Sequence, residues 1–193
     1  ADVTCLWQGG AGTGMGRFSL DVHGARLAVE LPYPGAHFAE NLAAAFAVSE
    51  IFGFSPAEAA AALQSPVSVE GRFCCRETGC LTLIDDTYNA NPLSMRRAIE
   101  CAAEMAAGRP LVLVLGDMLE LGAGAADEHR ELGRFIATKA VGAVIWRGAQ
   151  AEAVRLGLGN GAWPGSFARA ADSAAFDAAW EEVAPVEGVV LFT

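Results

Sequence analysis

The stretch "PLVLVLGDMLELG", Pro110 to Gly122, joins an uninterrupted apolar run to a loop that carries Asp117 and Glu120. A short apolar run without alternating polar residues is typical of a parallel strand that is buried on both faces. Parallel strands are joined by crossover connections, which are usually helices. The stretch therefore predicts an α/β fold in which a polar loop leaves the carboxyl end of a central strand.

The segments around this stretch alternate in the same way. "NPLSMRRAIECAAEMAAG" predicts a helix with Asn91 as the N-cap and Pro92 as its first residue. "RFCCRETGCLTLIDD" predicts a hairpin that turns at Thr78 and Gly79. After the loop we expect helices over "GAADEHRELGRFIATKA", "AQAEAVRLG" and "ARAADSAAFDAAWEEVA", and strands over "GAVIWRG" and "GVVLFT". Residues 71–193 are thus predicted to form a Rossmann-like, mostly parallel sheet flanked by helices.

Residues 1–70 follow a different pattern, which places a domain boundary close to Gly71. A strand over "DVTCLW" and a β-hairpin over "RFSLDVHGARLAVEL" are followed by two predicted helices, "AHFAENLAAAFAVSEIFG" and "SPAEAAAALQS". The second helix has strong start signals, because Ser55 and Glu58 can form a capping box around Pro56.

The glycine-rich stretch "QGGAGTGMGRFSL" does not match a phosphate-binding loop. Gly9 and Gly14 have the spacing of G-x-x-x-x-G-K-[ST], but Met15 occupies the position of the lysine. The pattern G-x-G-x-x-G fails in every frame, and a strand rather than a helix is predicted to follow. We expect a hairpin turn here.

Composition excludes several function classes. The net charge of −10 disfavours nucleic acid as a partner, and no apolar run approaches the roughly 18 residues that a membrane span needs. The five cysteines contain no C-x-x-C pair and the three histidines are scattered, so no metal site is expected. Reduced thiols indicate a cytoplasmic protein. The start "ADVTCLW" and the apolar end "VEGVVLFT" suggest a piece cut from a longer chain.

Two polar loops follow predicted strands, and ligands of parallel sheets bind beyond the carboxyl ends of the strands. In "IDDTYNANP", an Asx-rich turn and an N-cap explain Asn91. They do not require Asp85, Asp86, Tyr88 and Asn89 together. The second loop is "LGDMLELG" with Asp117 and Glu120. For His129, on the next predicted helix, a role at the site and a solvated surface position remain equally open.

These loops carry a resemblance to a known family. "LIDDTYNANPLSM" and "VLVLGDMLELG" resemble the carboxy-terminal domain of the Mur ligases, which form amide bonds in peptidoglycan synthesis. They most resemble the members that join D-alanyl-D-alanine to UDP-N-acetylmuramoyl-tripeptide. "GAHFAENLAAAFAVSEIFG" and "VEGRF" resemble the end of the family's central domain. The resemblance implies that residues 1–70 are the C-terminal part of a central ATP-binding domain and residues 71–193 the last domain.

The resemblance also implies roles for particular residues. Asn41 matches the adenine contact, with His37 one turn earlier, and Arg72 matches an interdomain arginine that meets the nucleotide and is the catalytic candidate. Asp86, or alternatively Asp85, matches the ribose ligand, and Tyr88 and Asn89 border the same pocket. The loop with Asp117 and Glu120 is the candidate dipeptide site.

The implied reaction uses ATP and Mg²⁺ to convert the tripeptide carboxylate into an acyl phosphate, which the dipeptide amine attacks. The family also has an amino-terminal domain that holds the UDP-sugar, and its central domain carries the phosphate loop. That loop, the family's carbamylated lysine and most Mg²⁺ ligands would precede Ala1. The chain by itself is therefore expected neither to ligate D-alanyl-D-alanine nor to hydrolyse ATP.

Two other functions remain open. One is another acid–amino acid ligase of the same superfamily, of the folylpolyglutamate or cyanophycin synthetase type, although the Y-N-A-N-P string argues against it. The other is a nucleotide-binding module without catalysis. A G-K-T loop encoded shortly before Ala1 would favour the ligase, and a start codon there would favour the module.

Overall fold

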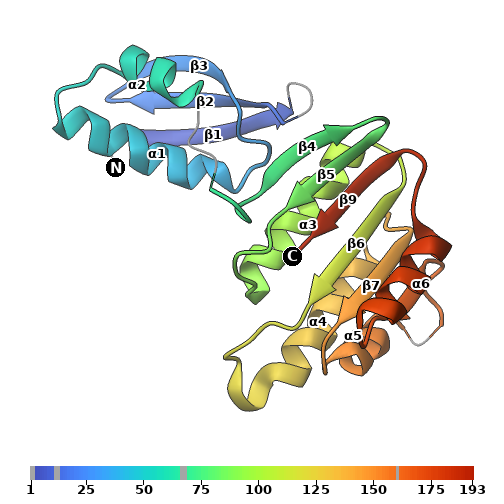
Figure 1. The fold of residues 1–193 in the computed structure, drawn as a ribbon. Helices are drawn as coiled ribbons and strands as arrows, with labels where there is room; N and C mark the ends of the chain where they lie inside the picture. Colours follow the sequence, from blue (N-terminus) through green and yellow to red (C-terminus); the bar gives the residue numbers. More distant parts are fainter. Residues whose placement is uncertain (1–2, 11–13, 66–68, 160) are drawn as a thin grey trace. The chain divides into compact units, whose positions relative to one another are not determined.

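The computed structural model describes residues 3–10, 14–65, 69–159 and 161–193 (Figure 1). The chain divides into two compact units, Ala1–Ser68 and Val69–Thr193. No helix among the described residues is long and apolar enough to cross a membrane.

The first unit contains an antiparallel sheet of three strands, in the order β1-β2-β3. Its strands are β1 (Val3–Gly10), β2 (Gly16–Val22) and β3 (Ala25–Leu31). His23 and Gly24 turn the hairpin with φ of 50° and 86°, and two positive φ values are characteristic of a type I′ turn. The predicted hairpin is confirmed, and a strand follows the glycine-rich stretch as expected. Residues 11–13 of that stretch lie outside the described part.

Two helices follow, α1 (Phe38–Ile51) and α2 (Pro56–Leu63). The core of the unit joins the sheet to α1 and is formed by Phe18, Leu20, Leu31, Leu42 and Phe46. The predicted capping box is present, because Ser55 Oγ accepts from the Glu58 amide at 3.3 Å and Glu58 Oε2 accepts from the Ser55 amide at 2.8 Å.

The second unit contains a sheet of six strands in the order β4-β5-β9-β6-β7-β8. Its strands are β4 (Cys74–Thr78), β5 (Leu81–Asp85), β6 (Leu111–Gly116), β7 (Ala143–Arg147), β8 (Ser166–Arg169) and β9 (Gly188–Phe192). The pair β4–β5 is antiparallel, whereas all other neighbours are parallel. The predicted mostly parallel sheet is confirmed.

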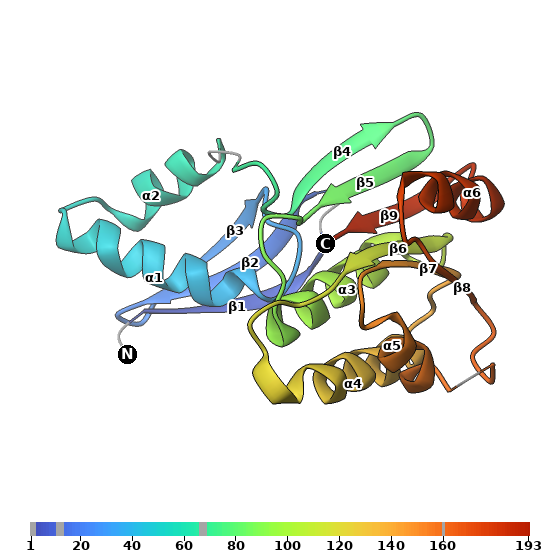
Figure 2. The ribbon, with the colours of Figure 1, turned by 60° about the horizontal axis from the view of Figure 1, so that its bottom comes forward.

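Helices cover both faces of this sheet. They are α3 (Pro92–Ala106), α4 (Ala125–Ala137), α5 (Ala151–Gly157) and α6 (Ser173–Val183), and a 3₁₀ turn, Gly122–Gly124, precedes α4. Figure 2 shows α3, α4 and α5 on one face and α6 on the other. Right-handed crossovers explain this arrangement. The chain advances in one direction from β5 to β6, β7 and β8, and α6 then returns it to β9 on the opposite face.

Two predicted details are wrong. The helix expected over residues 168–184 begins only at Ser173, after Asp172 as its N-cap, and Ser166–Arg169 form β8. The alanine-rich sequence favours a helix, but backbone pairing with β7 overrides this preference at the sheet edge. The hairpin turns at Gly79 and Cys80, one residue later than predicted, because Thr78 pairs with Leu81.

The carboxyl ends of the parallel strands lie at one edge of the sheet, and β9 holds the loops on both sides of it. The Asp86 amide donates to the Phe192 carbonyl at 2.9 Å, and the Gly116 amide donates to the Thr193 carbonyl at 2.9 Å. The two polar loops singled out from the sequence therefore leave the same edge of the second unit.

Candidate functional site

The loop after β5 folds against the segment that precedes β4. The Tyr88 amide donates to the Gly71 carbonyl at 2.9 Å. Gly71 has φ +71°, and a Cβ atom there would lie 2.8 Å from the Tyr88 nitrogen. Glycine is therefore required at position 71, both for its backbone conformation and for the close approach of the loop.

The two adjacent aspartates have different surroundings. Asp85 Oδ1 accepts from the amide and the hydroxyl of Thr87, at 3.2 Å and 2.7 Å, and so closes an Asx turn. Asp86 Oδ1 accepts from the Phe73 amide at 3.0 Å. Burial raises the pKa of Asp86 to about 6, although the Phe73 amide and the Arg72 guanidinium lower it, and Asp85 raises it further.

Arg72 and Tyr88 form the outer wall of this site. The guanidinium carbon lies 4.0 Å from the centroid of the Tyr88 ring, which is a cation–π contact. The Tyr88 side chain is nevertheless 64% exposed, and Asn89 is also exposed. Asn91 caps α3 by accepting from two amides, as the sequence predicted. A planar cation, an aromatic ring and a half-buried carboxylate thus meet at the end of β5.

At the end of β6, the carboxylate of Asp117 accepts three hydrogen bonds from its own unit. The donors are the Trp146 indole at 2.9 Å, the Ala149 amide at 2.7 Å and the Gln150 amide at 3.1 Å. Gly148, with φ +151°, lies so close that a Cβ atom would be 2.1 Å from Asp117 Oδ1. Asp117 therefore ties the loop after β6 to the loop after β7.

His129 is wholly buried in α4, so the surface position that the sequence left open for it is wrong. Its Nε2 atom accepts from the Met118 amide at 2.9 Å. Nε2 then carries no proton, and Nδ1 carries one and donates to the Ala125 carbonyl at 2.6 Å. The ring packs edge-on against Trp146, with 5.5 Å between the centroids.

Glu120 differs from Asp117 in its exposure and in its hydrogen bonds. Its side chain is exposed, and its carboxylate has no hydrogen-bond or ion-pair partner among the described residues. Its backbone has φ +63°, the left-handed region that residues other than glycine rarely adopt. Leu119 beside it is 76% exposed. The tip of the loop therefore offers one carboxylate and one apolar side chain to solvent.

In the first unit, the remaining predicted residues lie at the start of α1. His37 is the N-cap residue, and its ring lies 4.2 Å from the Phe38 ring. Asn41 is exposed in the first turn, four residues later and hence on the same face of the helix. The second unit brings Arg72, Asp86 and Tyr88 together.

Sequence reasoning missed the structural partners Trp146 and Gly148 and the backbone amide of Phe73. The signal available for Gly148 was its position at the end of the predicted strand that contains Trp146.

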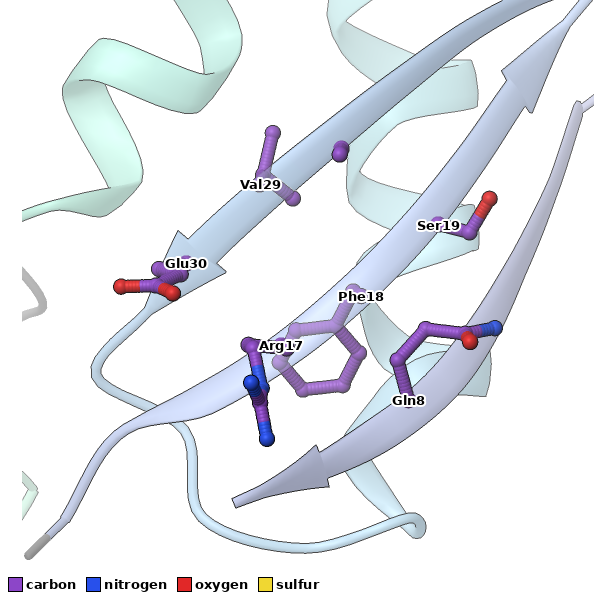
Figure 3. A pocket seen from close by; sticks show the side chains of 7 residues that line it. Gln8, Arg17, Phe18, Ser19, Val29 and Glu30 are labelled. Carbon is purple, nitrogen blue, oxygen red and sulfur yellow. The ribbon is translucent and has the colours of Figure 1, made fainter. Parts of the chain in front are cut away.

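Two hollows of the surface are lined by other residues. One, of about 500 Å³, lies on the three-stranded sheet (Figure 3). It is lined by Gln8, Arg17, Phe18, Ser19, Ala28, Val29 and Glu30. The other, of about 410 Å³, lies at the amino ends of β6 and β7, the edge opposite Asp117. Neither contains a residue that the sequence singled out, so the carboxyl edge remains the candidate site.

Comparisons with known proteins bear on the family of the chain. The UDP-N-acetylmuramoyl-tripeptide–D-alanyl-D-alanine ligase of Mycobacterium tuberculosis H37Rv is 40% identical over 125 residues, covering 62% of this chain and 24% of that protein. The Escherichia coli K12 enzyme of the same name is 36% identical over 145 residues, covering 75% and 32%. A crystal structure of MurF from Acinetobacter baumannii matches with a TM-score of 0.81 at 28% identity, covering 100% of this chain and 42% of that one.

The chain thus spans less than half the length of each of these proteins. The family described as "Mur ligase, glutamate ligase domain" matches residues 71–193, the whole six-stranded sheet with its helices. Because this match covers more than half of the chain, the chain belongs to the Mur ligase family.

Proposed function

We propose that this chain is part of an ATP-dependent ligase that joins D-alanyl-D-alanine to UDP-N-acetylmuramoyl-tripeptide in peptidoglycan precursor synthesis. Relatives at 40% and 36% identity carry that name. In this proposal residues 1–70 are the end of a central ATP-binding domain, residues 71–193 are the last domain, and the protein works in the cytoplasm. The observation that carries the proposal is the cluster of Arg72, Tyr88 and Asp86 at the carboxyl edge of the sheet.

The chemistry of this cluster suits a nucleotide. Asp86 Oδ1 is engaged by the Phe73 amide, and among the described residues Oδ2 has no partner, so it can accept from a ribose hydroxyl. The guanidinium of Arg72, the proposed catalytic residue, can pair with phosphate oxygens, and the exposed Tyr88 ring offers a flat surface. Asp85 and Asn89 border the same site.

In the first unit, we assign the adenine contact to Asn41, with His37 beside it, because a carboxamide can donate and accept hydrogen bonds at once. When bound, ATP with Mg²⁺ supplies the phosphoryl group that activates the tripeptide carboxylate.

The proposed dipeptide site is the loop with Asp117 and Glu120. The substrate amine enters as an ammonium group, which a carboxylate binds through charge-assisted hydrogen bonds. Glu120 is the exposed carboxylate of the loop, whereas the oxygens of Asp117 accept from three donors. Asp117 therefore contributes to this site through the loop that it anchors.

Steady-state kinetics of the complete protein would test both assignments at once. Asp86→Asn should raise KM for ATP by about tenfold, the loss expected for one hydrogen bond to a charged group, and leave KM for D-alanyl-D-alanine unchanged. Glu120→Gly should do the reverse, because glycine adopts the left-handed backbone readily and removes the side chain that carries the carboxylate. Asp177→Asn, at an exposed position of α6, is the control.

The assignment of D-alanyl-D-alanine as the substrate would be refuted if phosphate release did not depend on it. It would also be refuted if L-glutamate stimulated phosphate release more strongly. Equal effects of Asp86→Asn and Glu120→Gly on both Michaelis constants would refute the division of the site between the two loops.

A further inference from the structure

The β6–α4 loop, residues 117–121, is anchored at its base and open at its tip. Asp117 and Met118 are held by side-chain hydrogen bonds, and Met118 is only 3% exposed. The next two residues, Leu119 and Glu120, project into solvent. We propose that His129, Asp117 and Gly148 are positioning residues that fix this tip for the amine substrate, an inference that rests on the proposed function.

The first anchor joins two loops of the carboxyl edge through one carboxylate. Asp117 accepts from the Trp146 side chain, near the end of β7, and from the Ala149 and Gln150 amides of the β7–α5 connection. Hydrogen bonds to an ionised acceptor are stronger than those between neutral groups. The loops after β6 and β7 are therefore held together.

The second anchor is the imidazole of His129. It spans from the Ala125 carbonyl, within its own helix, to the Met118 amide in the loop. Only the neutral ring with its proton on Nδ1 can make both bonds, because a protonated Nε2 would present a hydrogen to the Met118 N–H. The ring thus fixes the backbone two residues before Glu120.

Gly148 makes the first anchor sterically feasible. Any Cβ atom at this position would overlap the carboxylate of Asp117, whose three atoms lie at 2.1, 2.2 and 2.6 Å from it. A side chain here must push Asp117 away from its donors.

Fixing the tip has a direct consequence for substrate binding. A loop that is already ordered loses less conformational entropy when a ligand binds, so affinity rises without a new contact. Glu120 holds a left-handed conformation that is unfavourable for a glutamate in isolation, and such conformations persist where the surroundings impose them. The anchors supply those surroundings.

A matched pair of substitutions separates the loop contact of His129 from its helix contact. His129→Gln can place a carboxamide oxygen near the position of Nε2 and accept from Met118, whereas His129→Asn reaches only the position of Nδ1 and keeps the bond to Ala125. In the complete protein, His129→Asn should raise KM for D-alanyl-D-alanine by about tenfold, as for one lost buried hydrogen bond, with KM for ATP unchanged. His129→Gln should restore most of the loss.

A pair of glycine substitutions tests the other anchor. Gly148→Ala and Gly108→Ala both place alanine at positive φ, +151° and +90°, but nothing lies within 4 Å of a Cβ atom at Gly108. Gly148→Ala should raise KM for the dipeptide and shift the Trp146 indole N–H resonance in the NMR spectrum. Gly108→Ala should do neither.

The outcomes are distinct. A wild-type protein that does not ligate D-alanyl-D-alanine refutes the proposed function, and the Trp146 resonance still reports whether Gly148 holds Asp117 in place. If the wild-type protein is active but His129→Asn and His129→Gln have equal Michaelis constants, or Gly148→Ala behaves like Gly108→Ala, the positioning role is wrong.

Discussion

Asp85 and Asp86 are chemically identical neighbours, yet the fold gives them different surroundings. Asp85 ends β5 and turns back to Thr87, whereas Asp86 faces the Phe73 amide in a partly buried position. Alternation along a strand directs consecutive side chains to opposite sides. The sequence alone could not show this difference in surroundings, because it depends on a backbone amide thirteen residues earlier in the chain.

Asp86 should make the stability of the chain depend on pH. Burial raises its pKa from 3.8 to about 6, so between these values the native state binds more protons than the unfolded state. The free energy of unfolding contributed by this group is then highest below pH 3.8 and falls as pH rises towards 6. Asp86→Asn should remove this fall. Urea unfolding of both chains across that pH range measures the difference, and parallel curves would contradict the assignment.

Helices and strands were predictable wherever local signals agree with tertiary packing. The N-caps Ser55 and Asn91 and the apolar run of β6 gave correct elements. The edge strand β8 was missed because four residues carry too little pattern to outweigh the helical preference of the alanines that follow. Close contacts between elements leave even less trace in a single sequence, and the helix pair α4 and α5 is the clearest case.

In this pair, glycines allow two backbones to touch. A Cβ atom at Gly133 would lie 2.3 Å from the Val154 carbonyl, and one at Gly157 would lie 2.1 Å from the Arg130 carbonyl. Gly133→Ala should therefore lower the free energy of unfolding by about 1–3 kcal/mol, the usual cost of overpacking, although alanine is the better helix former by about 1 kcal/mol.

Gly124→Ala is the matched control, because nothing lies within 4 Å of a Cβ atom at the start of α4. Chemical denaturation of the two variants gives the comparison. A Gly133→Ala chain as stable as the wild type would mean that the two helices separate at no cost.

At the scale of the whole molecule, the resemblance of the two loop motifs predicted the family, and periodicity predicted the sheet. The surroundings of the loop side chains could be seen only in the three-dimensional structure. Asp117 and Glu120 belong to one motif and are three residues apart, yet one is bound by its own protein and the other faces solvent. Loop residues of this kind are placed by contacts from distant segments, here Trp146 and His129, which no local pattern encodes.

The second unit should fold when it is produced alone. All strands of its sheet and the helices on both faces come from residues 74–192, and a domain of this size normally has its own core. A chain of residues 69–193 should therefore unfold cooperatively in urea.

A chain that begins at Cys74 keeps the sheet but loses the Phe73 amide that binds Asp86 and the Gly71 carbonyl that binds Tyr88. It should be less stable by about 3–5 kcal/mol, because the buried side chain of Phe73 is lost and Asp86 is left partly buried without its donor. The difference should shrink in Asp86→Asn, because the neutral side chain is less costly to bury. Loss of cooperative unfolding in the longer chain would show that residues 1–68 are required for the fold. Equal stability of the two chains would show that Phe73 and Gly71 do not stabilise the site.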